Sequence, residues 1–189
     1  MKKGVALLLI TILLTTILFS LTIMAQQKVK EINRDFQINS PIEEVWQVIG
    51  HEYADAYKWS ASLKHSEALD SESLNGSACT QRGCDIDGFG QITEKMLAYS
   101  NDEHLLSYEV TDGLPKFVIK LENTWKLWAA AGGNTNVEIR MKMQTKGVMG
   151  WLMGGIMKRK TEKILDRSLE ELKYYVENGE PHPRTLKAS

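Results

Sequence analysis

Three side chains in the middle of the chain could take part in acid–base chemistry: Arg82, Glu94 and Tyr108. A guanidinium, a carboxylate and a phenol that meet inside an apolar cavity can polarise a carbonyl group and move a proton. The same residues also fit a simpler interpretation, in which they form a structural pair or face solvent. Both interpretations stay open at this stage, because the choice depends on whether Arg82 projects inward.

The residue types that usually bind metals or act as nucleophiles do not form a recognisable set, so we assign no catalytic residue, no metal site and no cofactor. The cysteines, Cys79 and Cys84, fall in one predicted strand, where five residues cover roughly 16 Å, so a disulfide would need a tight turn at residues 81–83. Their spacing is also not that of a metal site. The four histidines are spread over a predicted helix, strand, turn and tail: His51, His65, His104 and His182.

The charge balance excludes a strongly basic protein. Lys and Arg number 23 against 24 Asp and Glu, which gives a net charge of −1, so nothing indicates nucleic-acid binding. A basic run, Lys158-Arg159-Lys160, is predicted to lie on the solvated side of a helix, paired with nearby acids. Contact with anionic lipid headgroups is the alternative. The oligomeric state has no sequence signal.

The first 25 residues predict a membrane segment. Gly4 to Met24 contains 21 residues without a charge, which is long enough to span a bilayer. A cleaved signal peptide is the alternative, but its apolar region is usually shorter, and the best cleavage site, after Ala25, has the large Ile23 two positions earlier. We therefore predict an uncleaved N-terminal anchor that attaches the protein to a membrane.

The orientation of this anchor is less clearly indicated. Basic residues nearly balance on its two sides, so the positive-inside rule does not decide the orientation. The short basic head before the apolar run favours export, which would make the domain extracytoplasmic.

Beyond the anchor, the sequence predicts a strand at 28–39, a helix with Ser40 as N-cap and Pro41 as first residue, and a short helical segment at 51–57. Apolar and polar residues then alternate, and turn dipeptides such as Asn75-Gly76 separate the segments. After Gly147 the spacing becomes helical as far as residue 178, and 179–189 are predicted to be a disordered tail. The alternation predicts six strands: 63–69, 77–86, 90–99, 104–111, 117–130 and 136–146.

This order predicts an α+β fold of the helix-grip type, a bent antiparallel sheet of about seven strands around a long C-terminal helix, formed by residues 28–178. The segment Ile38–Trp46 resembles the opening strand and Ser/Ala-Pro-x-x-x-Val-Trp helix of the START/polyketide-cyclase superfamily (SRPBCC, birch-pollen-allergen-like proteins). Trp59 resembles the Trp that closes the second helix in that superfamily. Further similarities are Asp87-Gly88-Phe89-Gly90 followed by Thr93-Glu94, and Leu106-x-Tyr108.

The resemblance covers about residues 30 to 178 and implies a cavity between the sheet and the long helix. Different relatives use it for sterols, phospholipids, quinones, polyketides or plant hormones, and only some of them are enzymes. We expect the ligand-binding residues to be aromatic and methionine side chains, although a packed core is the alternative: Trp59, Tyr108, Phe117, Trp125, Met141, Met143, Met149, Trp151 and Met153.

The segment Val148–Met157 favours a cavity, because its three Met and three Gly suit an adaptable mouth for apolar ligands. A membrane-facing surface is the other explanation. The first functional hypothesis is a membrane-tethered binder or carrier of an apolar small molecule, such as a lipid, quinone or polyketide-like compound. The second is a cyclase or dehydratase acting in the same cavity, and the third is an interaction module with a filled core.

Overall fold

The computed structural model of the chain describes residues 4, 10–13, 15 and 27–188. Most of the predicted anchor, Gly4 to Met24, lies outside these residues. Within the described part of the chain, no helix is both long enough and apolar enough to cross a membrane.

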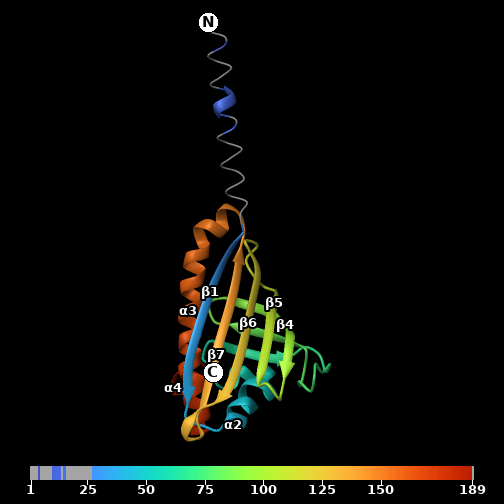
Figure 1. The fold of residues 1–189 in the computed structure, drawn as a ribbon, viewed down its shortest axis with the longest axis vertical. Coiled ribbons are helices and arrows are strands. Elements are labelled where there is room, and N and C mark those ends of the chain that lie inside the picture. Colours follow the sequence, from blue (N-terminus) through green and yellow to red (C-terminus); the bar gives the residue numbers. More distant parts are fainter. Residues whose placement is uncertain (1–3, 5–9, 14, 16–26, 189) are drawn as a thin grey trace.

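The described residues contain one antiparallel sheet, with spatial order β1-β7-β6-β5-β4-β3-β2 (Figure 1). Strands β2 to β7 follow one another as a meander, and β1 pairs with β7 along its whole length. The predicted α+β fold with seven strands is therefore confirmed. The strands are β1 Lys28–Ile38, β2 Leu63–Ala68, β3 Gln81–Ile86, β4 Gly90–Ser100, β5 Leu105–Asp112, β6 Val118–Ala129 and β7 Thr135–Thr145.

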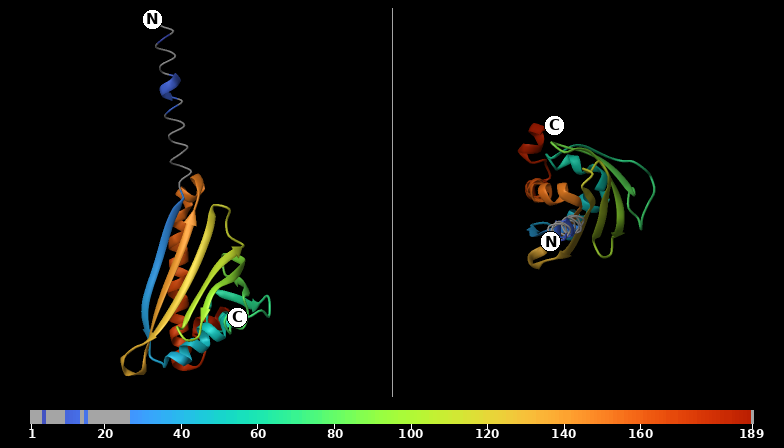
Figure 2. Two further views of the ribbon diagram at one scale, coloured as in Figure 1. Left: turned by 45° about the vertical axis from the view of Figure 1, so that its right-hand side comes forward. Right: turned by 90° about the horizontal axis from the view of Figure 1, so that it is seen from above.

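One helix, α3 (Gly147–Asn178), lies along the inner face of the sheet, which curves around it (Figure 2). It ends where Gly179 adopts a left-handed conformation and its N–H bonds the carbonyl of Tyr175, as glycine does at many helix ends. The single long C-terminal helix is thus confirmed. Between the sheet and α3 lies the main core, whose largest fully buried side chains include Trp46, Leu127 and Leu172.

The short helices close one end of this core. They are α2 (Ile42–Trp46), a π-helical turn η1 (Gln47–His51) and a 3-10 segment η2 (Tyr53–Lys58). The predicted N-cap is wrong, because the Ser40 hydroxyl donates to the Glu44 carboxylate and Pro41 occupies the cap position.

The turn after β5 requires a glycine. Gly113 has a φ of +87°, and a Cβ atom there would lie 2.1 Å from the carbonyl oxygen of Gln91. Side chains of L residues rarely adopt this conformation, so residue 113 fixes how β5 leaves the sheet.

The C-terminal tail differs from the prediction of disorder. Residues Pro183–Ala188 form a short helix, α4, in which Thr185 is buried and donates to the carbonyl of Trp59 at 3.1 Å. Arg184 bonds Glu170 on α3 at 2.6 Å. These tertiary contacts hold α4 in place.

Candidate ligand-binding cavity

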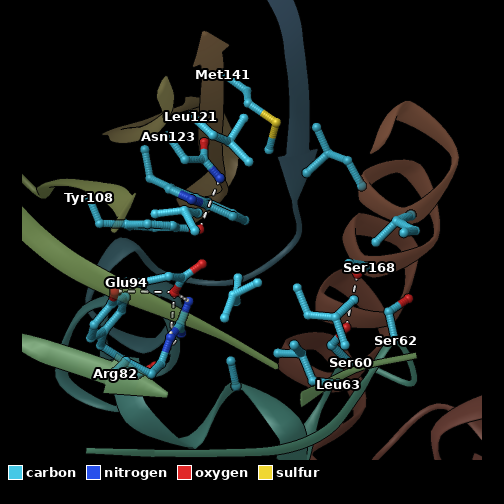
Figure 3. A pocket seen from close by; sticks show the side chains of 18 of the residues that line it. Ser60, Ser62, Leu63, Arg82, Glu94, Tyr108, Leu121, Asn123, Met141 and Ser168 are labelled. Atoms are coloured by element: carbon cyan, nitrogen blue, oxygen red, sulfur yellow. Dashed lines mark hydrogen bonds and ion pairs between the residues drawn. The ribbon is translucent and has the colours of Figure 1, made fainter. Parts of the chain in front are cut away.

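A cavity of about 160 Å³ lies between the sheet, η2 and α3. Most of its wall is apolar, and Figure 3 shows polar side chains gathered at two places. On the sheet side these are Arg82, Glu94, Tyr108 and Asn123, and on the α3 side they are three serines. An apolar cavity with a few convergent polar groups has the usual composition of a small-molecule site.

Arg82 and Glu94 form a buried ion pair in the wall of the cavity. The two residues are direct partners across β3 and β4, and each is only 6 % exposed. The Arg82 Nε atom donates to Glu94 Oε2 at 2.8 Å, and a second guanidinium nitrogen bonds the same oxygen. The third nitrogen donates to the carbonyl of Tyr53 at 2.5 Å. These bonds hold the guanidinium against Glu94 and Tyr53, and three of its five N–H donors are used in them.

The Glu94 carboxylate keeps one oxygen for another partner. The hydrogen bonds that reach it from Arg82, Tyr53 and Cys84 all end on Oε2. Figure 3 shows the carboxylate of Glu94 directed toward the open middle of the cavity. Its Oε1 atom is therefore placed to accept a hydrogen bond from a ligand.

Tyr53 and Tyr108 surround this ion pair with aromatic rings. The guanidinium carbon of Arg82 lies 3.9 Å from the ring centre of Tyr53 and 5.4 Å from that of Tyr108, within the range of a cation–π interaction. Burial raises the pKa of Tyr53 well above its usual value of 10, and burial, with Glu94 adding to it, raises the pKa of Tyr108 to about 12. Both hydroxyl groups therefore stay protonated at neutral pH and can act as donors.

Asn123 brings an unpaired polar atom to the cavity. Its amide nitrogen donates to the Tyr108 hydroxyl at 2.9 Å, whereas its Oδ1 atom is buried and has no partner among the described residues. Turning the amide over would exchange the two atoms and leave the nitrogen unpaired instead. A buried amide atom without a hydrogen bond costs about 1–3 kcal/mol, so this site favours a ligand that supplies the missing bond.

A second unpaired atom belongs to Trp59. Its Nε1 donor is buried and has no hydrogen-bond partner in the described part of the chain, and the residue lines the cavity. Next to it, the hydroxyls of Ser60 and Ser168 bond each other at 2.9 Å. The cavity wall thus offers acceptors on the sheet side and an indole donor near η2.

The structure places four of the nine predicted ligand-binding residues on the cavity wall. These are Trp59, Tyr108, Trp125 and Met141. Trp59 directly follows η2, and the other three lie on β5, β6 and β7, whose inward positions meet in front of α3. The alternation of apolar residues predicted the inward direction of the three that lie on strands.

The other five predicted residues lie outside the cavity. Met143 is inward-facing and buried, but it packs in the sheet beyond the cavity's end. Phe117 precedes β6 and is half-buried. The three residues at the start of α3 point outward and are exposed: Met149, Trp151 and Met153. Periodicity predicts a face but not how far along that face a cavity extends, which explains Met143. The three α3 residues lie on the outward side because Gly150 and Gly154 take the inward positions of the same turns.

Two residues that the sequence interpretation overlooked are part of the site. Asn123 occupies an inward position of β6 between Leu121 and Trp125, and a polar residue at such a position was the available signal. Tyr53 lies on η2, where the irregular turns gave no period from which to infer its direction.

The cysteines and histidines contribute little to this site. Cys79 and Cys84 are free and buried, and residues 81–83 are extended in β3, so the turn that a disulfide would require is not present. Cys79 precedes the strand in which it was predicted. Among the described residues, no group of His, Cys, Asp and Glu side chains has the geometry to hold a metal ion.

Comparisons with known proteins agree with this architecture. Norcoclaurine synthase from Thalictrum flavum superposes with a TM-score of 0.64 at 12% identity, over 81% of this chain and 96% of the enzyme. The protein XoxI from Bacillus cereus gives 0.63 at 16% identity, over 80% and 99% of the two chains. Ara h 8.0201 gives 0.59 at 16% identity, over 79% and 98%. At such identities these likenesses establish the fold alone.

Sequence comparison is more specific. None of the curated proteins matches the chain significantly. Residues 30–177 match the family model described as polyketide cyclase / dehydrase and lipid transport, which agrees with the superfamily that the motifs around Pro41 and Trp59 resembled. The chain therefore belongs to the polyketide cyclase/dehydrase and lipid transport family.

Proposed function

We propose that the domain binds an apolar small molecule that carries a hydroxyl group, and that it acts as a membrane-tethered binder or carrier. The cavity of about 160 Å³ is close to the roughly 150 Å³ of an engineered apolar cavity that holds benzene. It therefore fits one ring, such as the head of a quinol or a polyketide-like aromatic compound. A larger lipid would extend beyond it.

The observation that carries this proposal is the pair of free oxygen atoms on the sheet side of the cavity. Asn123 Oδ1 is buried without a partner among the described residues, and the hydrogen bonds that reach Glu94 from Arg82, Tyr53 and Cys84 end on Oε2 and leave Oε1 to the cavity. Each would gain a hydrogen bond from a ligand hydroxyl, and an unmade bond in an apolar site is costly.

The ligand's polar group is a neutral donor rather than a cation. Arg82 already balances the charge of Glu94 at the buried ion pair. An added ammonium group would leave one net positive charge in an apolar enclosure, which is strongly unfavourable. A hydroxyl satisfies the acceptors without adding charge.

Thermal unfolding with two ligands of equal size tests this proposal. A ligand that binds only the folded state raises the melting temperature with its concentration. We expect p-cresol to raise it more than p-xylene, because only p-cresol donates a hydrogen bond. Asn123→Leu should reduce this difference, whereas the matched change Asn33→Leu, at an exposed position of β1, should leave it intact. The proposal fails if neither compound stabilises the protein.

A second candidate function, a cyclase or dehydratase, has one observation in its favour. The free Glu94 oxygen and the protonated Tyr108 hydroxyl lie in the same cavity wall, so an acceptor and a donor of protons are both present. Catalytic activity that requires both Glu94 and Tyr108 would favour the enzyme. This activity should disappear in Tyr108→Phe, while the variant still binds p-cresol. Ligand binding without turnover favours the carrier.

The proposed tether and export rest on residues 1–25, whose apolar run of 21 residues is long enough to cross a bilayer. The mass of the mature protein tests retention of this segment. We expect the full-length mass, and a species that begins at Gln26 would show that the segment is a cleaved signal peptide. Protease protection in sealed cells tests on which side of the membrane the domain lies.

A further inference from the structure

The first three turns of α3, residues 147–157, here called the α3 tip, have an inverted distribution of side chains. Large apolar residues point to solvent: Trp151 is 62% exposed and Ile156 is 60% exposed. Leu152 and Met149 are exposed as well. A surface helix normally buries such residues and presents polar ones, so the tip exposes an apolar patch of the kind that marks an interaction site.

Small residues occupy the inward side of the same turns. Gly150 and Gly154 are buried, and a Cβ atom at Gly150 would lie 3.0 Å from Thr145, while one at Gly154 would lie 2.8 Å from the Lys30 side chain. The helix therefore packs closely against the ends of β7 and β1 through its glycines. This packing directs the large side chains away from the domain.

The α3 tip lies beside the point where the chain enters the domain. Lys28, the first residue of β1, pairs with Thr145, the last residue of β7, and α3 begins two residues later at Gly147. Figure 1 shows these ends of β1, β7 and α3 together. Met24, the end of the apolar run, is four residues before Lys28, a reach of at most about 14 Å. An anchor at residues 4–24 therefore holds this end of the domain against the bilayer.

The charges around the tip are complementary to an anionic lipid surface. No acidic residue occurs between residues 147 and 161, whereas Lys158, Arg159 and Lys160 follow the apolar turns. Lys158 pairs with Glu162 at 3.6 Å and Lys160 donates to the carbonyl of Gly88, so the exposed Arg159 is the member of this run best placed to contact a headgroup. Lys28 and Lys146 are exposed at the same end. Basic residues near an anionic membrane are attracted to its surface, and tryptophan favours the boundary between headgroups and acyl chains.

We propose that the α3 tip inserts its exposed apolar side chains into the surface of an anionic lipid bilayer. This inference rests on the tether in the proposed function for its geometry, but not on ligand binding. Inserted apolar side chains would leave water, and the exposed Lys28, Lys146 and Arg159 would contact headgroups, as in amphipathic helices that lie in a membrane interface. The domain would then stand on the membrane with β1, β7 and α3 extending away from it.

Spin labels on the full-length protein test this orientation. One label is attached to Trp151→Cys and the control label to Leu186→Cys, an equally exposed apolar position on α4. The native cysteines are buried, and the protein without a new cysteine gives the blank. The protein is reconstituted into vesicles of phosphatidylcholine and phosphatidylserine. The accessibility of each label is measured with oxygen, which concentrates in lipid, and with a water-soluble nickel complex.

We expect a ratio of oxygen to nickel accessibility several-fold higher at residue 151 than at residue 186. Vesicles of phosphatidylcholine alone should lower the ratio at residue 151, because the basic residues lose their partners. The protein could co-sediment with vesicles and yet show the same low ratio of oxygen to nickel accessibility, typical of water, at both positions. That result would overturn the insertion and leave the tether intact. Absence of co-sedimentation overturns both, while p-cresol binding independently tests the cavity.

Discussion

The guanidinium of Arg82 and the carboxylate of Glu94 face each other across β3 and β4, with 2.8 Å between Nε and Oε2. Both residues are buried, so the pair has lost its hydration and depends on mutual hydrogen bonds. The pair forms part of the cavity wall, and because its two charges cancel, this part of the wall carries no net charge. The state of this pair therefore affects both the stability of the fold and the kind of ligand the cavity accepts.

Removing one member of the pair should destabilise the protein strongly. We expect Arg82→Met or Glu94→Leu alone to reduce the free energy of unfolding by about 3–5 kcal/mol, since each leaves a buried charge without a partner. The double variant should lose much less than the sum of the two single losses. Urea unfolding of the four proteins measures this, and additive losses would show that the two charges do not depend on each other.

Two methionines on β7 should respond differently to enlargement. Met141 lines the cavity, whereas Met143, on the same face, is buried outside it. Met141→Trp should fill the cavity, preserve the melting temperature and abolish the stabilisation by p-cresol. Met143→Trp should overpack the sheet and cost roughly 1–3 kcal/mol, with the ligand response retained. If the two variants exchanged these effects, the cavity would lie elsewhere along the strand.

The buried tyrosines predict a loss of stability in strong base. Burial raises the pKa of Tyr108 to about 12, so between pH 10 and 12 the unfolded chain releases a proton that the folded protein retains. The stability contributed by this group is complete below pH 10 and is lost as the pH rises toward 12, by about 1.4 kcal/mol per pH unit.

Urea unfolding at several values of pH in this interval tests the slope. Tyr108→Phe should make the dependence shallower, and the remaining slope reports Tyr53 and the buried thiols. An unchanged slope in this variant would show that the Tyr108 hydroxyl is not held in its protonated form by burial.

The thiol of Cys84 should be inert in the folded protein. Burial raises its pKa to about 12, and the reactive thiolate is then scarce near neutral pH. We expect slow alkylation by iodoacetamide at pH 8 and rapid alkylation of both cysteines in urea without a reductant, because both are free. Alkylation in urea only after reduction would indicate a disulfide between Cys79 and Cys84.

Local sequence signals were sufficient to predict the order of the strands and helices. Alternation from Leu63 to Thr145 predicted the strands to within a few residues at each boundary, and the helical spacing after Gly147 predicted one long helix, because these periods reflect which face each side chain presents. The motif around Pro41 and Trp46 pointed to the family. Caps and tails were less predictable, as Ser40 and α4 show, because individual side-chain contacts that leave no period in the sequence decide them.

The sequence by itself determined that Tyr108, Trp125 and Met141 face the interior, since the two-residue period of a strand leaves only two directions. Only the tertiary structure decided where along that interior the cavity lies, because its ends depend on how η2 and α3 pack against the sheet. The partners of Arg82 were likewise decided by the register that places it opposite Glu94. The outward direction of Trp151 followed from glycines that bring α3 close to β7 and to β1, and β1 lies more than a hundred residues earlier in the sequence.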